Sequence, residues 1–264
     1  MKKRKTSLVL LVGIISMLSC SILGLTACGS NANQSPNNNQ PVSNREFTQA
    51  VVNGLQAHWT ITDAAQQNLS ADQFVDAMQK EYDAVKDYEN KSFADENMEK
   101  PAKDYISAVK DSIDAVSYYD NNSKFEQKYT KEAYPRRCSA LYQINKIEPL
   151  SVSESQKSDL NDVLGDGELS YASGLIAKNA EFKKEKDKYE GETYHTYSAV
   201  VKNTSDIDFS YFSFDINLVD KDGVTVKTTT ASTENWKAGS KHRFEFSTDK
   251  KFKKIEIQSY DSSR

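Results

Sequence analysis

The spacing of apolar residues changes once along this chain, and that change constrains the fold more than any other feature of the sequence. From about residue 45 to 190, apolar residues recur every three or four positions, which is the period of an amphipathic helix. After about residue 191 they alternate with polar residues, which is the period of a half-buried strand. We therefore predict a segregated α+β fold, with an N-terminal helical bundle at 45–190 and a small antiparallel β-sandwich of immunoglobulin-like type at 191–264.

The first half of the helical region contains three apolar stripes. The first runs from Phe47 to Leu55, and Ser70 with Gln73 matches a capping box in front of the second. The third stripe follows Pro101, which we expect in the first turn of its helix because a proline is tolerated there. Stripes of this kind must pack against one another to bury their apolar faces, which favours a bundle.

The second half of the helical region contains stronger interruptions. Pro135 is expected to kink or interrupt a stripe that runs from Phe125 to Tyr142. Ser153 with Gln156 matches a second capping box, and the sequence GDG at 165–167 is expected to break the chain after it. The charged segment from Leu175 to Tyr189 could form a last helix that leads into the strands.

The strand region shows its clearest alternation in FSFDINLV at 212–219. Asp222-Gly223 follows directly and predicts a tight turn into the next strand. Further strands are expected in YSAVV at 197–201, HRFEF at 242–246 and KKIEIQSY at 253–260, with Trp236 in the core between them.

The N-terminus has the layout of a secretory signal, because a block of basic residues at 2–5 precedes an uncharged apolar run from Leu8 to Ala27. The residues Leu25, Thr26, Ala27 and Cys28 resemble the lipobox of bacterial lipoproteins, in which the cysteine is lipidated and the signal is cleaved before it. The resemblance implies a signal peptide at 1–27 and a lipid on Cys28. The Asn-, Ser- and Pro-rich residues after it, to 44, are expected to form a disordered linker. An uncleaved membrane anchor is the alternative.

The strand region also resembles a known family. The order VVKNTS, FSFDINLVDKDGVTV and WKAGSKHRFEF is similar to the C-terminal β-sandwich modules of Gram-positive surface lipoproteins called FxLYD domains. Ile216, Leu218 and Asp220 stand at the namesake positions, and Val219 replaces the tyrosine. The resemblance implies an extracellular adhesive or structural domain and no chemistry.

Composition excludes several kinds of function. The formal charge of −4 and the lack of a long basic block argue against a nucleic-acid partner. The residues His58, His195 and His242 lie on separate segments without metal-ligand spacing, although His195 and His242 could meet across the sandwich. DKDG at 220–223 fails the EF-hand pattern at both ends, and we expect it to form a hairpin turn instead. No metal, cofactor or catalytic residue is therefore predicted.

Two further features leave alternatives open. Cys138 has no partner for a disulfide once Cys20 leaves with the signal, and it is expected to be a small buried residue rather than a nucleophile. The chain has 14 tyrosines, among them Tyr118 and Tyr119. They could line an acidic groove for a cationic partner, or they could simply close the bundle while their hydroxyls reach water.

These observations predict a lipoprotein attached to the cell membrane through Cys28 and facing the extracellular side. Its expected role is that of a non-enzymatic binding or structural module of the cell envelope, with an unidentified protein or cell-wall partner. The alternatives are a solute-binding lipoprotein of an importer, which would normally need two α/β lobes, and a cell-envelope hydrolase that uses scattered groups such as His195, His242 or Cys138.

Overall fold

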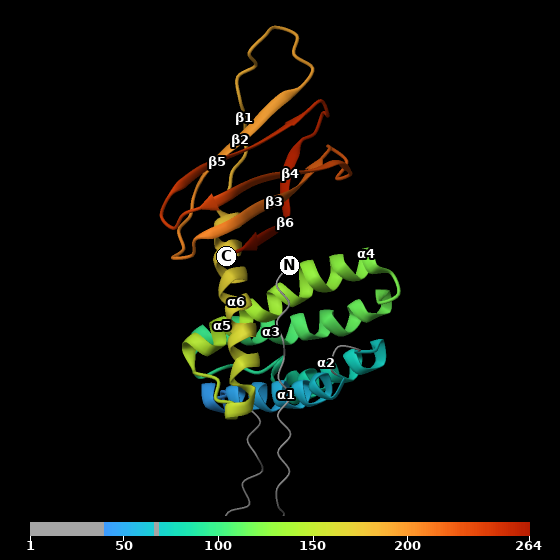
Figure 1. Cartoon of the computed structure of the whole chain (residues 1–264), viewed down its shortest axis with the longest axis vertical. Helices are drawn as coiled ribbons and strands as arrows, with labels where there is room; N and C mark the ends of the chain where they lie inside the picture. The colour runs from blue at the N-terminus through green and yellow to red at the C-terminus, as the bar shows by residue number, and fades with distance from the viewer. Residues whose placement is uncertain (1–39, 66–68) are drawn as a thin grey trace, which may run out of the picture. The chain divides into compact units, whose positions relative to one another are not determined.

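The structure is a computed structural model and describes residues 40–65 and 69–264. The segregated α+β fold is confirmed, because every helix of the described part ends by Lys178 and every strand begins at Lys183 or later. Figure 1 shows the helices in blue to yellow and the strands in orange to red.

The helical part is built from six α-helices and short connecting turns. The α-helices are α1 (Asn44–Ala65), α2 (Ala71–Val85), α3 (Glu96–Ala115), α4 (Asn122–Phe125), α5 (Tyr134–Ile147) and α6 (Lys157–Lys178). Three 3₁₀ turns, η1 (Lys86–Tyr88), η2 (Val116–Tyr118) and η4 (Glu154–Gln156), and one π-helical segment, η3 (Glu126–Ala133), connect them.

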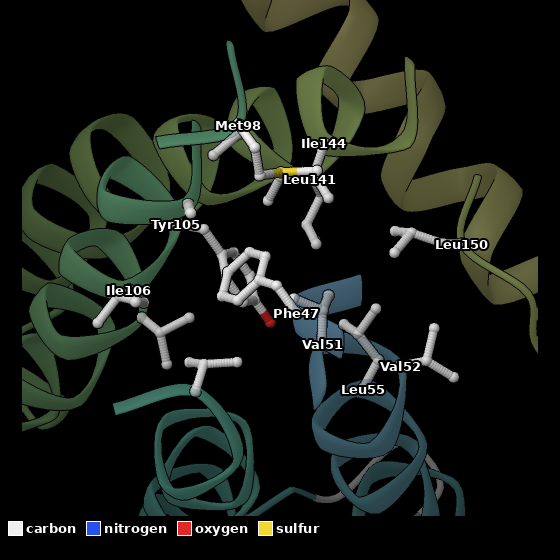
Figure 2. Packing of buried hydrophobic residues seen from close by; sticks show 14 of the residues in the cluster. Phe47, Val51, Val52, Leu55, Met98, Tyr105, Ile106, Leu141, Ile144 and Leu150 are labelled. Atoms are coloured by element: carbon white, nitrogen blue, oxygen red, sulfur yellow. The ribbon is translucent and has the colours of Figure 1, made fainter. Parts of the chain in front are cut away.

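The core of the bundle is formed by the apolar stripes that the sequence predicts. Phe47, Val51 and Leu55 of α1 are fully buried and face Tyr105 of α3 and Leu141 of α5 (Figure 2). Residues 40–44, which the sequence assigns to the disordered linker, belong to this fold. Val42 is buried, its backbone N–H donates to the carbonyl of Ser92 at 2.8 Å, and its own carbonyl accepts from Ala94.

The helix starts agree only in part with the predicted capping residues. Ser70 caps α2 and forms the predicted box with Gln73, in which side chain and backbone exchange both hydrogen bonds. The second box is wrong, since the Ser153 hydroxyl bonds the side chain of Gln156 and caps no helical N–H. Asp95 caps α3, so this helix begins before the predicted start and Pro101 lies in its second turn rather than its first.

Pro135 does not break the helix that contains it. It lies at the start of α5, directly after the π-helical segment Glu126–Ala133. A proline lacks an N–H and clashes with the carbonyl four residues earlier. The wider π-turn, with its bonds five residues apart, changes this spacing just before the proline, and the chain passes from α4 to α5 without a loop.

The GDG segment at 165–167 was predicted to end a helix, and this prediction is wrong. Helix α6 continues through it to Lys178. A Cβ atom on Gly167 would lie 2.2 Å from the carbonyl oxygen of Cys138, so the absence of a side chain lets α6 pack against the backbone of α5. Gly167 therefore serves close helix packing, which outweighs its low helix propensity.

The predicted last helix is also wrong in extent. Only Leu175 to Lys178 of the segment Leu175–Tyr189 is helical, as the end of α6, and Lys183–Lys184 forms the short strand β1. The chain reaches the sheets through a non-helical connection.

Two three-stranded antiparallel sheets make up the strand part. The strands are β2 (His195–Lys202), β3 (Phe209–Val219), β4 (Thr225–Trp236), β5 (Lys241–Thr248) and β6 (Lys254–Ser263), in addition to β1. One sheet has the order β1-β2-β5 and the other β4-β3-β6. Their buried residues form one cluster, in which Phe212 and Phe214 of β3 meet Phe244 of β5 across the two sheets.

The predicted hairpin and tryptophan are both confirmed. Residues 220–224 connect β3 to β4, Gly223 has a φ of 80°, and the Asp220 carboxylate accepts from the backbone N–H groups of Asp222 and Val224. The side chain of Asp220 thus stabilises the turn through hydrogen bonds to the backbone of the turn. Trp236 is 3% exposed and packs against Phe209 and Phe244.

Helix α6 contributes to both cores. Leu160 and Val163 belong to the bundle cluster, whereas Ile176 and Ala177 belong to the sandwich cluster. The hydroxyl of Tyr260 on β6 donates to the carbonyl of Ser170 at 2.8 Å, which fixes the helix to this strand.

None of the helices within residues 40–65 and 69–264 is long and apolar enough to span a membrane. The predicted signal peptide at 1–27, the lipidated Cys28 and most of the linker to 44 lie outside the described residues.

Candidate functional site

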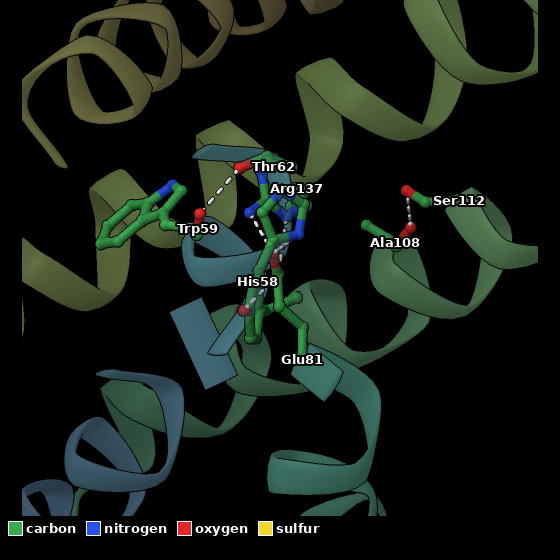
Figure 3. A network of polar contacts seen from close by, with 8 residues as sticks. His58, Trp59, Thr62, Glu81, Ala108, Ser112 and Arg137 are labelled. Atoms are coloured by element: carbon green, nitrogen blue, oxygen red, sulfur yellow. Dashed lines mark hydrogen bonds and ion pairs between the residues drawn. The ribbon is translucent and has the colours of Figure 1, made fainter. Parts of the chain in front are cut away.

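Four helices of the bundle bring polar side chains together around Glu81, which is fully buried (Figure 3). Arg137 donates from Nε to Oε2 of Glu81 at 2.7 Å and from a terminal nitrogen to Oε1 at 2.5 Å. The Tyr105 hydroxyl donates to Oε2 at 2.7 Å, and Nδ1 of His58 lies 2.8 Å from Oε1. One carboxylate thus connects α1, α2, α3 and α5.

Charge pairing decides the protonation of this cluster. Burial on its own would raise the pKa of Glu81, but the positive charge of Arg137 and the adjacent His58 hold it well below its usual range. Burial and the Glu81 charge raise the pKa of Tyr105 well above its usual value. Since Glu81 and Arg137 are 0% and 2% exposed, a ligand does not reach the pair, and the cluster serves structure rather than binding.

The residues that the sequence considered for catalysis lie apart from one another. His195 pairs with Thr248 at one end of the β2–β5 ladder and His242 pairs with Val201 at the other, a separation of about 20 Å along the strands. They do not meet across the sandwich. Burial raises the pKa of the Cys138 thiol to about 11, so the thiol is protonated at neutral pH, which does not suit a nucleophile.

Within the described residues, no group of three or more histidine, cysteine or acidic side chains is arranged to hold a metal ion. His195 instead has its Nδ1 2.8 Å from Asp187, and His242 contacts the hydroxyl of Thr233 and the ring of Phe244.

A cleft of 470 Å³ lies between α6 and the loop that joins β2 to β3. Its helical wall presents two tyrosines, Tyr142 from α5 and Tyr171 from α6, whose ring centroids are 5.9 Å apart. Leu175, 43% exposed, extends this wall, and Ile207 lies opposite it in the loop. The cleft therefore has one apolar, partly aromatic wall.

The loop wall of the cleft is held in place by the buried Asn203. Its side-chain amide donates to the carbonyl of Ile207 at 2.8 Å, while its Oδ1 accepts from the backbone N–H and the hydroxyl of Ser205. Its backbone also bonds Gly239 and Ser240. Both ends of the Asn203 amide are thus bonded within the loop, which ties Ser205 and Ile207 to Asn203.

Three carboxylates and one guanidinium line this cleft. Glu168 pairs with Arg264 at 2.6 Å, and Asp208 pairs with Lys237 at 2.8 Å. The hydrogen bond from Lys237, with that from the backbone of Ala238, lowers the pKa of Asp208, so this carboxylate is ionised at neutral pH. Asp206 is exposed and, within the described part of the chain, makes no hydrogen bond or ion pair. The lining of the cleft therefore carries a net negative charge.

The tyrosines that the sequence singled out lie elsewhere. The Tyr119 hydroxyl bonds the backbone of Leu69, and Tyr118 lies beneath the ammonium of Lys124. The cleft could not be predicted from the sequence, because its residues come from α5, α6, the 203–208 loop and Arg264, which only the tertiary fold brings together.

No family model and no curated protein matches this chain. One solved structure, an alkylpurine DNA glycosylase AlkC from Pseudomonas fluorescens bound to DNA containing an abasic site analogue, matches with 11% identity and a TM-score of 0.17, over 74% of this chain and 67% of that one. The comparisons give no support to the predicted module of the cell envelope or to its importer and hydrolase alternatives, and we withdraw that prediction. A likeness this low assigns neither a fold nor an activity, so function is argued below from the residues of this chain.

Proposed function

We propose that this protein binds an amphipathic cation, meaning an apolar body that carries one positive group, in the cleft between α6 and the 203–208 loop. The observation that carries the proposal is the combination of an aromatic wall and an acidic wall around one cleft. Neither wall alone would define a ligand.

The acidic wall supplies the attraction for a positive charge. Asp206 is the carboxylate of the cleft without a cationic partner within residues 40–65 and 69–264, and its neighbours Ser205 and Ile207 are both bonded to Asn203. A charged group that pairs with it gains a charge-assisted hydrogen bond without first breaking an existing ion pair. Asp208 and Glu168 add to the local negative potential.

The aromatic wall supplies contact area for an apolar body. Tyr142 and Tyr171 present ring surfaces, and Leu175 extends this surface toward solvent. The ring of Tyr142 already lies 5.6 Å from the ammonium of Lys146, which indicates that its face accommodates a cation. A cleft of 470 Å³ is within the usual size range for small-molecule sites, which favours a small ligand or a single side chain.

The test uses two probes that differ only in charge, 4-phenylbutylamine and 4-phenylbutanol, with binding measured by titration calorimetry. We expect the amine to bind about two- to fivefold more tightly than the alcohol, because Asp206 is exposed and an exposed ion pair contributes about 0.4–1 kcal/mol. Asp206→Asn should remove most of this difference. Asp222→Asn, in the β3–β4 turn, is the matched control and should leave binding unchanged.

Equal affinity for amine and alcohol, or no binding of either at millimolar concentration, would refute the proposal. Loss of amine binding in Asp222→Asn as well would indicate a general charge effect rather than a site at Asp206.

Location is a separate proposal that rests on the sequence alone. We propose that Cys28 carries a lipid and that the folded part is held at the outer side of the cell membrane through it. The charge block, apolar run and lipobox-like residues support this proposal, and the binding cleft does not depend on it.

A further inference from the structure

Arg264 occupies the acidic end of the cleft with its own positive charge. One terminal nitrogen of its guanidinium donates to Oε2 of Glu168 at 2.6 Å and to the backbone carbonyl of Gly165 at 3.1 Å. The hydroxyl of Tyr142 lies 3.5 Å from the other oxygen of Glu168. The cleft that we assign to a cationic ligand thus already contains a guanidinium, which is bonded to Glu168 of the cleft and to the Gly165 carbonyl beside it.

We propose that Arg264 is a stand-in for the ligand, and that the ligand of the cleft carries a guanidinium group which displaces it from Glu168 and Gly165. This inference rests on the proposed function and names the chemical class of the cation. It also assigns Arg264 the role of an internal competitor.

The backbone and side chain of Arg264 are held very differently, which makes such an exchange feasible. The carbonyl of Arg264 accepts from the hydroxyl of Ser210 at 3.0 Å, and Ser210 also bonds the hydroxyl of Ser263, so the backbone stays on β3. The side chain is 47% exposed and Glu168 is 43% exposed. An ion pair this accessible to water is weak, so the guanidinium can leave while the strand stays paired.

The site favours a guanidinium over an ammonium for geometric reasons. A guanidinium is planar, so it can donate to Glu168 while one face lies against an aromatic ring, and Tyr142 and Tyr171 supply such rings on the same wall. An ammonium keeps its charge at a point and is more strongly hydrated, so it gains less from the ring faces.

The experiment compares 4-phenylbutylguanidine with 4-phenylbutylamine on the wild type and three variants by calorimetry. Arg264→Gln removes the competing charge and should tighten binding of the guanidine about two- to fivefold, since an exposed ion pair of about 0.4–1 kcal/mol no longer has to be broken. Arg264→Lys keeps a competing charge and should bind more weakly than Arg264→Gln. Glu168→Gln should abolish the preference for guanidine over amine.

A purely structural role for Arg264 predicts the opposite sign, because Arg264→Gln would then loosen the cleft and weaken binding. A second readout is the side-chain Nε–H signal of Arg264 in the nuclear magnetic resonance spectrum, identified by its loss in Arg264→Gln. Saturation with the guanidine should move this signal to the position of a free arginine.

The outcomes separate the two proposals. If the amine and the guanidine bind equally well, or if the Arg264 signal does not move, the inference is wrong while the cleft still binds cations. If neither probe binds the wild type or Arg264→Gln, the proposed function itself is wrong.

Discussion

Replacing Gly167 by alanine should destabilise the protein strongly, whereas the same change two residues earlier should not. A Cβ atom on Gly167 would lie 2.2 Å from the carbonyl oxygen of Cys138, 2.8 Å from its carbonyl carbon and 2.8 Å from Cβ of Tyr142. Two of these three atoms belong to the backbone of α5, so no rotation of a side chain relieves the clash. Helix α6 would have to move away from α5 by about 1 Å.

The magnitude follows from two opposing effects. Overpacking in a well-packed core costs about 1–3 kcal/mol, and a clash with backbone belongs at the upper end of this range. Alanine in place of glycine inside a helix gains about 0.5–1 kcal/mol. Gly165, in the same helix, has no atom within 4 Å of the position of a Cβ, so Gly165→Ala should show only the gain.

The propensity gain is common to both variants, so they should differ by the clash alone, about 2–3 kcal/mol in free energy of unfolding, which corresponds to about 4–12 °C in Tm for a chain of this size. Urea and thermal unfolding followed by circular dichroism at helical wavelengths measure both quantities. Equal stability of the two variants would refute the packing argument and leave helix propensity as the only role of these glycines.

Three further predictions concern other parts of the chain. Glu81→Ala should lower the free energy of unfolding by about 3–5 kcal/mol at pH 7, because it leaves the charge of Arg137 buried without a partner. The double variant Glu81→Leu with Arg137→Met should recover most of this loss, as measured by urea titration. Since the pKa of Glu81 is lowered in the folded protein, its contribution to the free energy of unfolding is present above about pH 4.3 and is lost as the pH falls further. The difference in free energy of unfolding between wild type and Glu81→Ala should therefore narrow below this pH. The pKa of Tyr105 is raised in the folded protein, so its contribution is present below about pH 10 and is lost above it; in Tyr105→Phe, stability should fall less steeply between pH 9.5 and 11. Cys28→Ser should abolish incorporation of labelled fatty acid and release the protein from the membrane fraction, and an unchanged label would contradict the lipid anchor.

Periodicity in the sequence predicts which parts are helical and which are strands, because each signal is contained in a short window. The stripe from Phe47 to Leu55 and the alternation from Phe212 to Leu218 both face the cores as expected. The Ser70 capping box and the Asp222-Gly223 turn are correct for the same reason, since every bond in them joins residues close in sequence.

Errors arise where a distant contact overrides a local preference. Gly167 reads as a helix breaker in its own window, and only the approach of Cys138 explains why glycine is needed inside the helix. The Glu81 cluster is likewise invisible in the sequence, since Tyr105 and Arg137 lie 24 and 56 residues away from it. The cleft depends on the tertiary fold to an even greater degree.

Helix α6 couples the unfolding of the two cores, because it belongs to both. Leu160 and Val163 in its first half are buried in the bundle cluster, and Ile176 and Ala177 in its second half are buried in the sandwich cluster. Unfolding of this one helix would expose apolar surface in the bundle and in the sandwich at the same time. We therefore expect a single transition in which the calorimetric enthalpy equals the van't Hoff enthalpy. A protease cut between Lys178 and Lys183 would accordingly yield fragments that stay associated through the Tyr260–Ser170 junction rather than two autonomous halves.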